Sequence, residues 1–135
     1  MSVLRKMLNL ASTERDIALA WLQIGAIFFA MRSCEYLKTA KEDSKRTKII
    51  QLGNLCFKKD GKNLSTNSPF LHTADMVRVR FEFQKNDKRD VIVHMFKSGD
   101  KVLCPVIAWA ATVKRVKLIK NSSQNSEVCL FQEKI

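Results

Sequence analysis

The clearest pattern along the chain is an alternation of apolar and polar residues between Val77 and Phe83. A period of two predicts a β-strand with one buried face, at about residues 76–84. Residues 91–96 are mostly apolar and predict a second strand. Because only a short charged connector, which contains Lys85, separates the two segments, they are expected to form an antiparallel hairpin.

Two longer segments carry helical patterns. Residues at about 13–31 begin with cap signals at Ser12 or Thr13 and continue as an almost wholly apolar stretch, so they predict a helix that is covered on most sides. Residues at about 105–118 begin with a proline, and their apolar positions recur at helical spacing, which predicts an amphipathic helix. The remaining predicted elements are a helix at about 33–39 and strands at about 49–57 and 128–131.

These elements predict an α+β fold, a small antiparallel sheet with flanking helices, in one unit over residues 1–135. Asp60-Gly61 predicts a tight turn after the strand at 49–57. The four basic residues near the end of the 105–118 helix are expected to form a basic edge; they are Lys114, Arg115, Lys117 and Lys120.

Composition adds a strong positive charge to this fold. Lys and Arg number 24 against 13 Asp and Glu, a net charge of +11, and such a surface attracts polyanions. Nucleic acid is the usual partner of a basic domain. A solvated basic face without a ligand and a membrane-surface protein are the alternatives.

The cysteines favour an intracellular protein without a disulfide framework or a metal site. Cys34, Cys56, Cys104 and Cys129 are widely separated, with no Cys-x-x-Cys pair and no histidine at zinc-ligand spacing. The most apolar stretch, Ile17 to Met31, is shorter than a bilayer requires. We therefore expect no membrane segment, no metal and no cofactor.

Arg32 is the candidate for chemistry, because it directly follows the apolar helix and precedes Glu35 by three residues. An arginine at this depth needs a carboxylate partner or an anionic ligand, since an unpaired buried charge is costly. A guanidinium presents a fixed fork of donors that matches a phosphate group. The alternative is a purely structural ion pair between Arg32 and Glu35.

At these residues the sequence resembles the catalytic domain of the tyrosine recombinase (phage integrase) family, and in particular the recombinases of eukaryotic mobile elements such as Cryptons. The motifs that carry the resemblance occur in the family's order from about residue 11 to 131. They are Arg32, Glu35 and Leu37 after an apolar helix, Phe83-Gln84-Lys85-Asn86-Asp87 as the lysine-bearing hairpin, and Leu103-Cys104-Pro105-Val106 as the entry to a helix.

The resemblance implies double-stranded DNA as the partner and metal-free transesterification as the family's chemistry. Arg32 would stabilise charge on the phosphate, and Lys85 would protonate the leaving 5′ hydroxyl. The other basic residues expected to contact DNA are Lys38, Lys41, Lys45, Arg46, Lys88, Arg89 and Lys97.

The sequence departs from the family in ways that exclude a complete active site. The family's His-x-x-Arg motif is absent, because neither His72 nor His94 has an arginine three residues later. The single tyrosine, Tyr36, lies beside Glu35 and is not assigned as the nucleophile. The chain is therefore interpreted as an amino-terminal, DNA-binding fragment or remnant of a recombinase that is inactive alone.

An incomplete domain should leave apolar surface on residues 17–31 and 106–116. Self-association, or pairing with a missing carboxy-terminal half, is the expected consequence. The alternative function is a non-enzymatic basic nucleic-acid-binding module.

Overall fold

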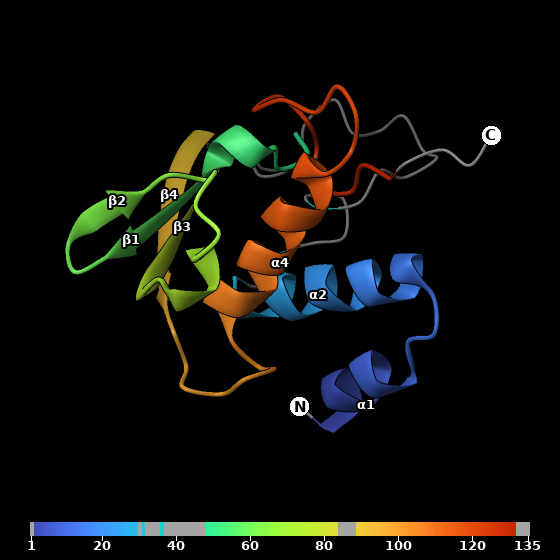
Figure 1. Cartoon of the computed structure of the whole chain (residues 1–135). Helices are drawn as coiled ribbons and strands as arrows, with labels where there is room; N and C mark the ends of the chain where they lie inside the picture. Colours follow the sequence, from blue (N-terminus) through green and yellow to red (C-terminus); the bar gives the residue numbers. More distant parts are fainter. Residues whose placement is uncertain (1, 30, 32–35, 37–47, 84–88, 132–135) are drawn as a thin grey trace.

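The computed structural model describes residues 2–29, 31, 36, 48–83 and 89–131 (Figure 1). Within these residues the protein is α+β, as predicted, with three α-helices and a four-stranded antiparallel sheet. The elements are α1 (Ser2–Leu10), α2 (Glu14–Phe28), the 3-10 turn η2 (Leu52–Asn54), β1 (Leu55–Lys59), β2 (Lys62–Leu64), the 3-10 turn η3 (Leu71–Thr73), β3 (Met76–Phe83), β4 (Arg89–Phe96) and α4 (Pro105–Lys117).

The sheet has the strand order β2-β1-β3-β4 and consists of two hairpins joined at β1 and β3. In the first hairpin, Asp60 and Gly61 both have positive φ, 51° and 77°. This pair of left-handed residues matches the twist of the strands and forms the predicted tight turn between Lys59 and Lys62.

The second hairpin, β3 with β4, confirms the alternating pattern. Val77, Val79 and Phe81 are buried on one face. The pairing is regular over the whole hairpin, from Met76 opposite Phe96 to Phe83 opposite Arg89. The turn that contains Lys85 lies outside the described residues, but both strands that lead into it are in register.

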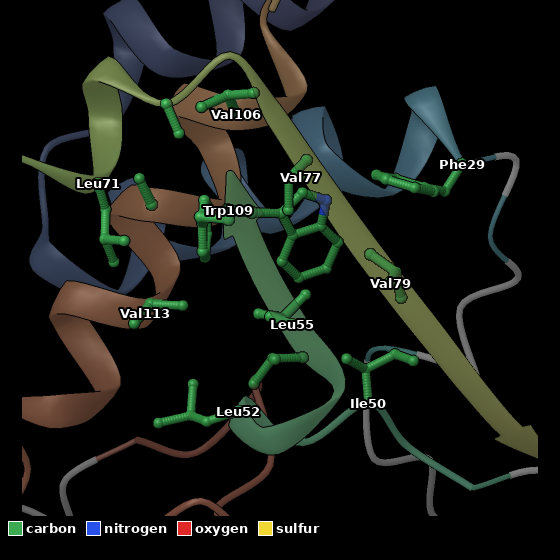
Figure 2. Close-up of a cluster of buried hydrophobic side chains, with 14 of the residues drawn as sticks. Phe29, Ile50, Leu52, Leu55, Leu71, Val77, Val79, Val106, Trp109 and Val113 are labelled. Atoms are coloured by element: carbon green, nitrogen blue, oxygen red, sulfur yellow. The ribbon is translucent and has the colours of Figure 1, made fainter. Parts of the chain in front are cut away.

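The described helices all lie on one side of the sheet (Figure 1). α4 packs on the buried face of the strands, and α2 packs on α4. Figure 2 shows Trp109 of α4 at the centre of this core, surrounded by Val77, Val79 and Leu55. The indole is fully buried and is the largest of the α4 side chains that join the helical layer to the sheet.

α2 approaches α4 closely because the residue facing the indole is Gly25. A Cβ atom added at Gly25 would lie 2.8 Å from Cε2 and 2.9 Å from Nε1 of Trp109, which is too close for any side chain. The indole Nε1 is buried and has no hydrogen-bond partner in the described part of the chain. Packing, not polar pairing, therefore holds Trp109 in this position.

The 13–31 helix begins as predicted but ends earlier. Thr13 caps α2 by accepting a hydrogen bond from the backbone N–H of Asp16 (3.0 Å). Most of α2 is covered, although Ile17 and Ile27 remain 40% and 52% exposed. The expectation of exposed apolar surface thus holds for α2. It is wrong for α4, where Val106, Trp109, Val113 and Val116 are all fully buried.

Two predicted strands are wrong. Residues 49–57 do not form one strand, because Gln51 and Asn54 cap each other's backbone and close the turn η2, so that β1 begins only at Leu55. Residues 128–131 form no strand: the isolated bridge is between Gln51 and Glu127, just before them, and the N–H of Val128 donates to the carbonyl of Ile50 (3.0 Å).

Of the predicted helix at 33–39, the structure describes Tyr36 alone. A helix that the sequence reasoning missed is α1, whose half-buried Leu4, Met7 and Leu8 recur at helical spacing and pack towards α2. None of the described helices has both the length and the apolar character that a bilayer span requires.

Asp100 organises the loop that leads into α4. Its carboxylate accepts hydrogen bonds from the backbone N–H groups of Val102 (2.8 Å) and Leu103 (3.0 Å), and it forms an ion pair with Arg5 of α1. These contacts stabilise the charged form, so they lower the pKa of Asp100 from 3.8 to about 2. One carboxylate thus joins α1 to the start of α4.

We expect Gly25→Ala to lower the free energy of unfolding by about 1 to 2 kcal/mol. Alanine is the better helix former, but overpacking against Trp109 outweighs that gain. Urea denaturation measures the change. The control is Gln23→Ala, in the same helix and half-buried, which should change stability by less than about 0.5 kcal/mol. A Gly25→Ala variant more stable than the wild type would contradict the close contact.

Acidification should lower the stability of the Asp100→Asn variant less than it lowers the stability of the wild type. The pKa of Asp100 is lower in the folded state than in the unfolded state. The stability that its carboxylate adds to the fold is therefore complete above about pH 4 and disappears as the pH falls towards about 2. Thermal unfolding across this range should therefore be steeper in pH for the wild type than for Asp100→Asn. Asp60→Asn, an exposed carboxylate without an ion pair, is the control. Identical slopes for the wild type and Asp100→Asn would exclude this role.

Candidate nucleic-acid interface

Most of the predicted DNA-contacting residues lie outside the part of the chain that the structure describes. For Arg89 the structure describes only the backbone, which lies in strand β4 opposite Phe83. Lys97 is fully described. The predicted residues outside the described ranges are Arg32, Glu35, Lys38, Lys41, Lys45, Arg46, Lys85 and Lys88.

The end of α2 gives the arginine segment a fixed starting point. Phe29, the C-cap residue, is buried and contacts Trp109 edge to face, with ring centroids 6.4 Å apart. The N–H of Met31 donates to the carbonyl of Ala26 (3.1 Å), which closes the helix end. The last described residues before the arginine segment are therefore held by the core at Phe29 and by a backbone hydrogen bond at Met31.

The far end of the same segment is linked to the lysine hairpin. Lys48 Nζ lies 2.8 Å from Glu82 Oε2, and Asn54 Nδ2 donates to the same oxygen (3.3 Å). The hydrogen bond from Lys48 is the main cause that lowers the pKa of Glu82. Glu82 lies near the end of β3, next to the 84–88 turn. The residue that follows segment 32–47 is thus joined by an ion pair to the strand that leads into Lys85.

Lys97, predicted to contact DNA, is already paired. Its Nζ lies 3.3 Å from Asp75 Oδ1, and the same carboxylate accepts the backbone N–H of Asp60 (2.8 Å). The Asp60 N–H and then Lys97 lower the pKa of Asp75, so the carboxylate stays charged at neutral pH. Lys97 remains 61% exposed, but its charge is offset locally.

Two of the four residues of the expected basic edge at the end of α4, Arg115 and Lys117, already bind other parts of the chain. Arg115 donates through both terminal nitrogens to the backbone carbonyls of Leu130 (2.5 Å) and Val128 (2.5 Å), and its guanidinium stacks on Phe131 at 4.6 Å from the ring centroid. Burial lowers the pKa of Arg115, although a guanidinium stays charged in proteins. Arg115 is therefore a tether for the carboxy-terminal segment.

Lys117 has a similar structural role. Its Nζ donates to Thr66 Oγ1 (2.8 Å) and Asn67 Oδ1 (2.5 Å), in a cleft of about 490 Å³ beside Gln124. Burial lowers the pKa of Lys117. Lys114 and Lys120 are exposed and make no ion pair or hydrogen bond with any described residue, so half of the expected basic edge remains free.

The two histidines and the tyrosine lie at separate places in the fold. His72 and His94 are exposed, in η3 and β4. Tyr36 packs partly buried against the core, and burial raises its pKa. The described residues contain no group of three metal-ligating side chains.

Comparison with known proteins adds no relative. No family model matches the chain, and neither a curated protein nor a solved structure matches it.

We expect Arg115→Met to lower the free energy of unfolding by about 2 kcal/mol. The variant keeps an apolar stem but leaves two carbonyls of the carboxy-terminal segment without their charged donor. Hydrogen exchange should show faster exchange of the Val128 amide, which bonds to Ile50. Lys114→Met, at the exposed neighbouring position, is the control. Equal stability of the two variants would show that the tether has no energetic role.

Proposed function

We propose that the chain binds double-stranded DNA as a module of the tyrosine recombinase type, in DNA recombination and integration. Three motifs in order support this proposal, and the described elements agree with their order. An apolar helix precedes the arginine segment, a regular antiparallel hairpin flanks the lysine turn, and a proline begins the helix after it. The fold class alone is common to many functions, so the motifs carry the proposal.

In the proposed role, Arg32 contacts a DNA phosphate and Lys85 approaches the same backbone from the hairpin. A planar guanidinium can donate two parallel hydrogen bonds to the phosphate oxygens, and the ammonium adds a point charge. Tyr36 is not proposed as the nucleophile, since it is partly buried against the core. We therefore propose DNA binding for this chain and not strand cleavage.

The observation that supports the proposal best is the ion pair between Lys48 and Glu82 (2.8 Å). It joins Lys48, the first described residue after the 37–47 segment, to Glu82, which precedes the 84–88 turn in β3 by two residues. It also neutralises the glutamate beside the hairpin turn. A DNA backbone that approached this region would therefore meet less repulsion.

Self-association is a second part of the proposal. Ile17 and Ile27 on α2 are 40% and 52% exposed, and Val3 and Leu10 on α1 are 66% and 81% exposed. Exposed apolar residues on two neighbouring helices give a second copy, or a further helical segment, an apolar surface to cover.

Arg32→Lys should weaken binding to a synthetic four-way DNA junction roughly tenfold and leave the unfolding midpoint unchanged. The charge is retained, but the fork of donors that fits a phosphate is lost. Fluorescence anisotropy and thermal unfolding on the same preparations measure both effects. Arg15→Lys, an exposed arginine at the start of α2, is the matched control and should change binding less than twofold.

A different outcome would favour the non-enzymatic module. If Arg32→Lys lowers stability and leaves junction binding unchanged, Arg32 is a structural partner of Glu35 and the recombinase-type role is wrong.

A further inference from the structure

One face of the sheet carries no described helix (Figure 1). We call it the outer sheet face and define it by the residues of β1, β3 and β4 that alternate with the buried ones. The strand register arranges these residues in neighbouring rows. They are Lys58, Met76 and Phe96 in one row, Cys56, Arg78 and His94 in the next, and Arg80 and Ile92 in the third, with Glu82 and Asp90 at the border of the face.

The unpaired charge on the outer sheet face is positive. Each described carboxylate at its border already has a cationic partner, with Lys97 on Asp75 at 3.3 Å, Arg80 on Asp90 at 2.7 Å and Lys48 on Glu82 at 2.8 Å. Lys58 and Arg78, in contrast, make no ion pair or side-chain hydrogen bond with any described residue. Two cations in the middle of the face thus have no counter-charge and are free to bind an anion.

The same face exposes an aromatic ring beside these cations. Phe96 is 69% exposed, and Ile92 on the same strand is 48% exposed. Phe96 lies opposite Met76, and Met76 lies opposite Lys58. Since neighbouring strands are about 4.8 Å apart and alternate residues about 6.7 Å apart, the ring, His94 and the two free cations lie within one small patch.

We propose that the outer sheet face binds single-stranded DNA. An exposed ring beside free cations fits a partner that offers both unpaired bases and phosphates, because a base can stack on the ring while Lys58 and Arg78 contact the backbone. A duplex keeps its bases stacked on each other and cannot use Phe96 in this way. An acidic peptide would use the cations but not the aromatic platform.

No described carboxylate on this face is free to select RNA over DNA. A 2′-hydroxyl both donates and accepts hydrogen bonds, and a free carboxylate would be a strong acceptor for its hydrogen, whereas the described carboxylates around the face are all in ion pairs and the Asn63 carbonyl oxygen lies 3.7 Å from the Cys56 thiol as its acceptor. This inference goes beyond the proposed function. It uses neither Arg32 nor Lys85, so it can fail or hold independently.

The test uses the full chain and a fluorescein-labelled dT12 oligonucleotide in anisotropy titrations. Phe96→Ala should weaken binding roughly fivefold or more through lost stacking. Arg78→Gln should weaken it and reduce the slope of log K against log salt by about 0.7, as expected for one phosphate contact on a single strand. Both side chains face solvent, and the unfolding midpoints should match the wild type.

The matched controls lie away from the face. Phe70→Ala removes an equally exposed ring, 63% accessible, and Lys120→Gln removes an exposed cation at the end of α4. Both should change dT12 binding less than twofold. If these controls weaken binding as much as Phe96→Ala and Arg78→Gln, binding is diffuse attraction to the net charge and the proposal is overturned.

Three other results would also overturn it. The first is tighter binding of rU12 than of dT12. The second is tighter binding of a 12-base-pair duplex with the same dependence on Phe96. The third is a Phe96→Ala variant that binds dT12 as tightly as the wild type but no longer forms a dimer in sedimentation velocity. That result would assign the face to a second copy of the chain. The proposed function is tested separately, by the binding of the Arg32→Lys variant to a four-way DNA junction.

Discussion

The contact between Trp109 and Gly25 is the constraint on which the rest of the fold depends. Only glycine allows α2 to lie against the indole, since a Cβ atom would approach Cε2 to 2.8 Å. The other side of the indole faces Val77 and Val79 of the sheet (Figure 2). Through this one side chain the helical layer and the sheet share a core. The end of α2, where Phe29 contacts the same indole edge to face, is thereby fixed relative to strand β3.

Net charge is a poor guide to which cations are available to a ligand. Arg115 holds the carboxy-terminal segment, Lys117 holds the loop at Thr66, and Lys97 neutralises Asp75. Each of these side chains contributes to the basic composition but has its donors in use. A ligand site must be sought where cations without a partner lie beside other groups that a ligand can use, and Lys58 and Arg78 on the outer sheet face, next to the exposed ring of Phe96, meet this condition.

The sequence predicted the elements whose patterns are long and local. The alternation in β3, the cap at Thr13 and the proline at the start of α4 each depend on neighbouring residues, and each was confirmed. The strand at 49–57 was wrong because a side-chain cap between Gln51 and Asn54 competes with the strand, and the tether of Arg115 joins residues 13 and 15 positions apart. Which charges remain free depends on such pairings, which periodicity does not encode. The roles of Arg32 and Lys85 remain predictions.

The most direct measurement of the proposed DNA-binding role is a map of amide chemical shifts. A ¹⁵N-labelled chain would be titrated with a four-way DNA junction. If Arg32 and Lys85 contact one backbone, the largest shift changes should occur together at residues 31–36 and 83–89. Changes confined to the end of α4, around Lys114 and Lys120, with none in those two segments, would contradict the proposal.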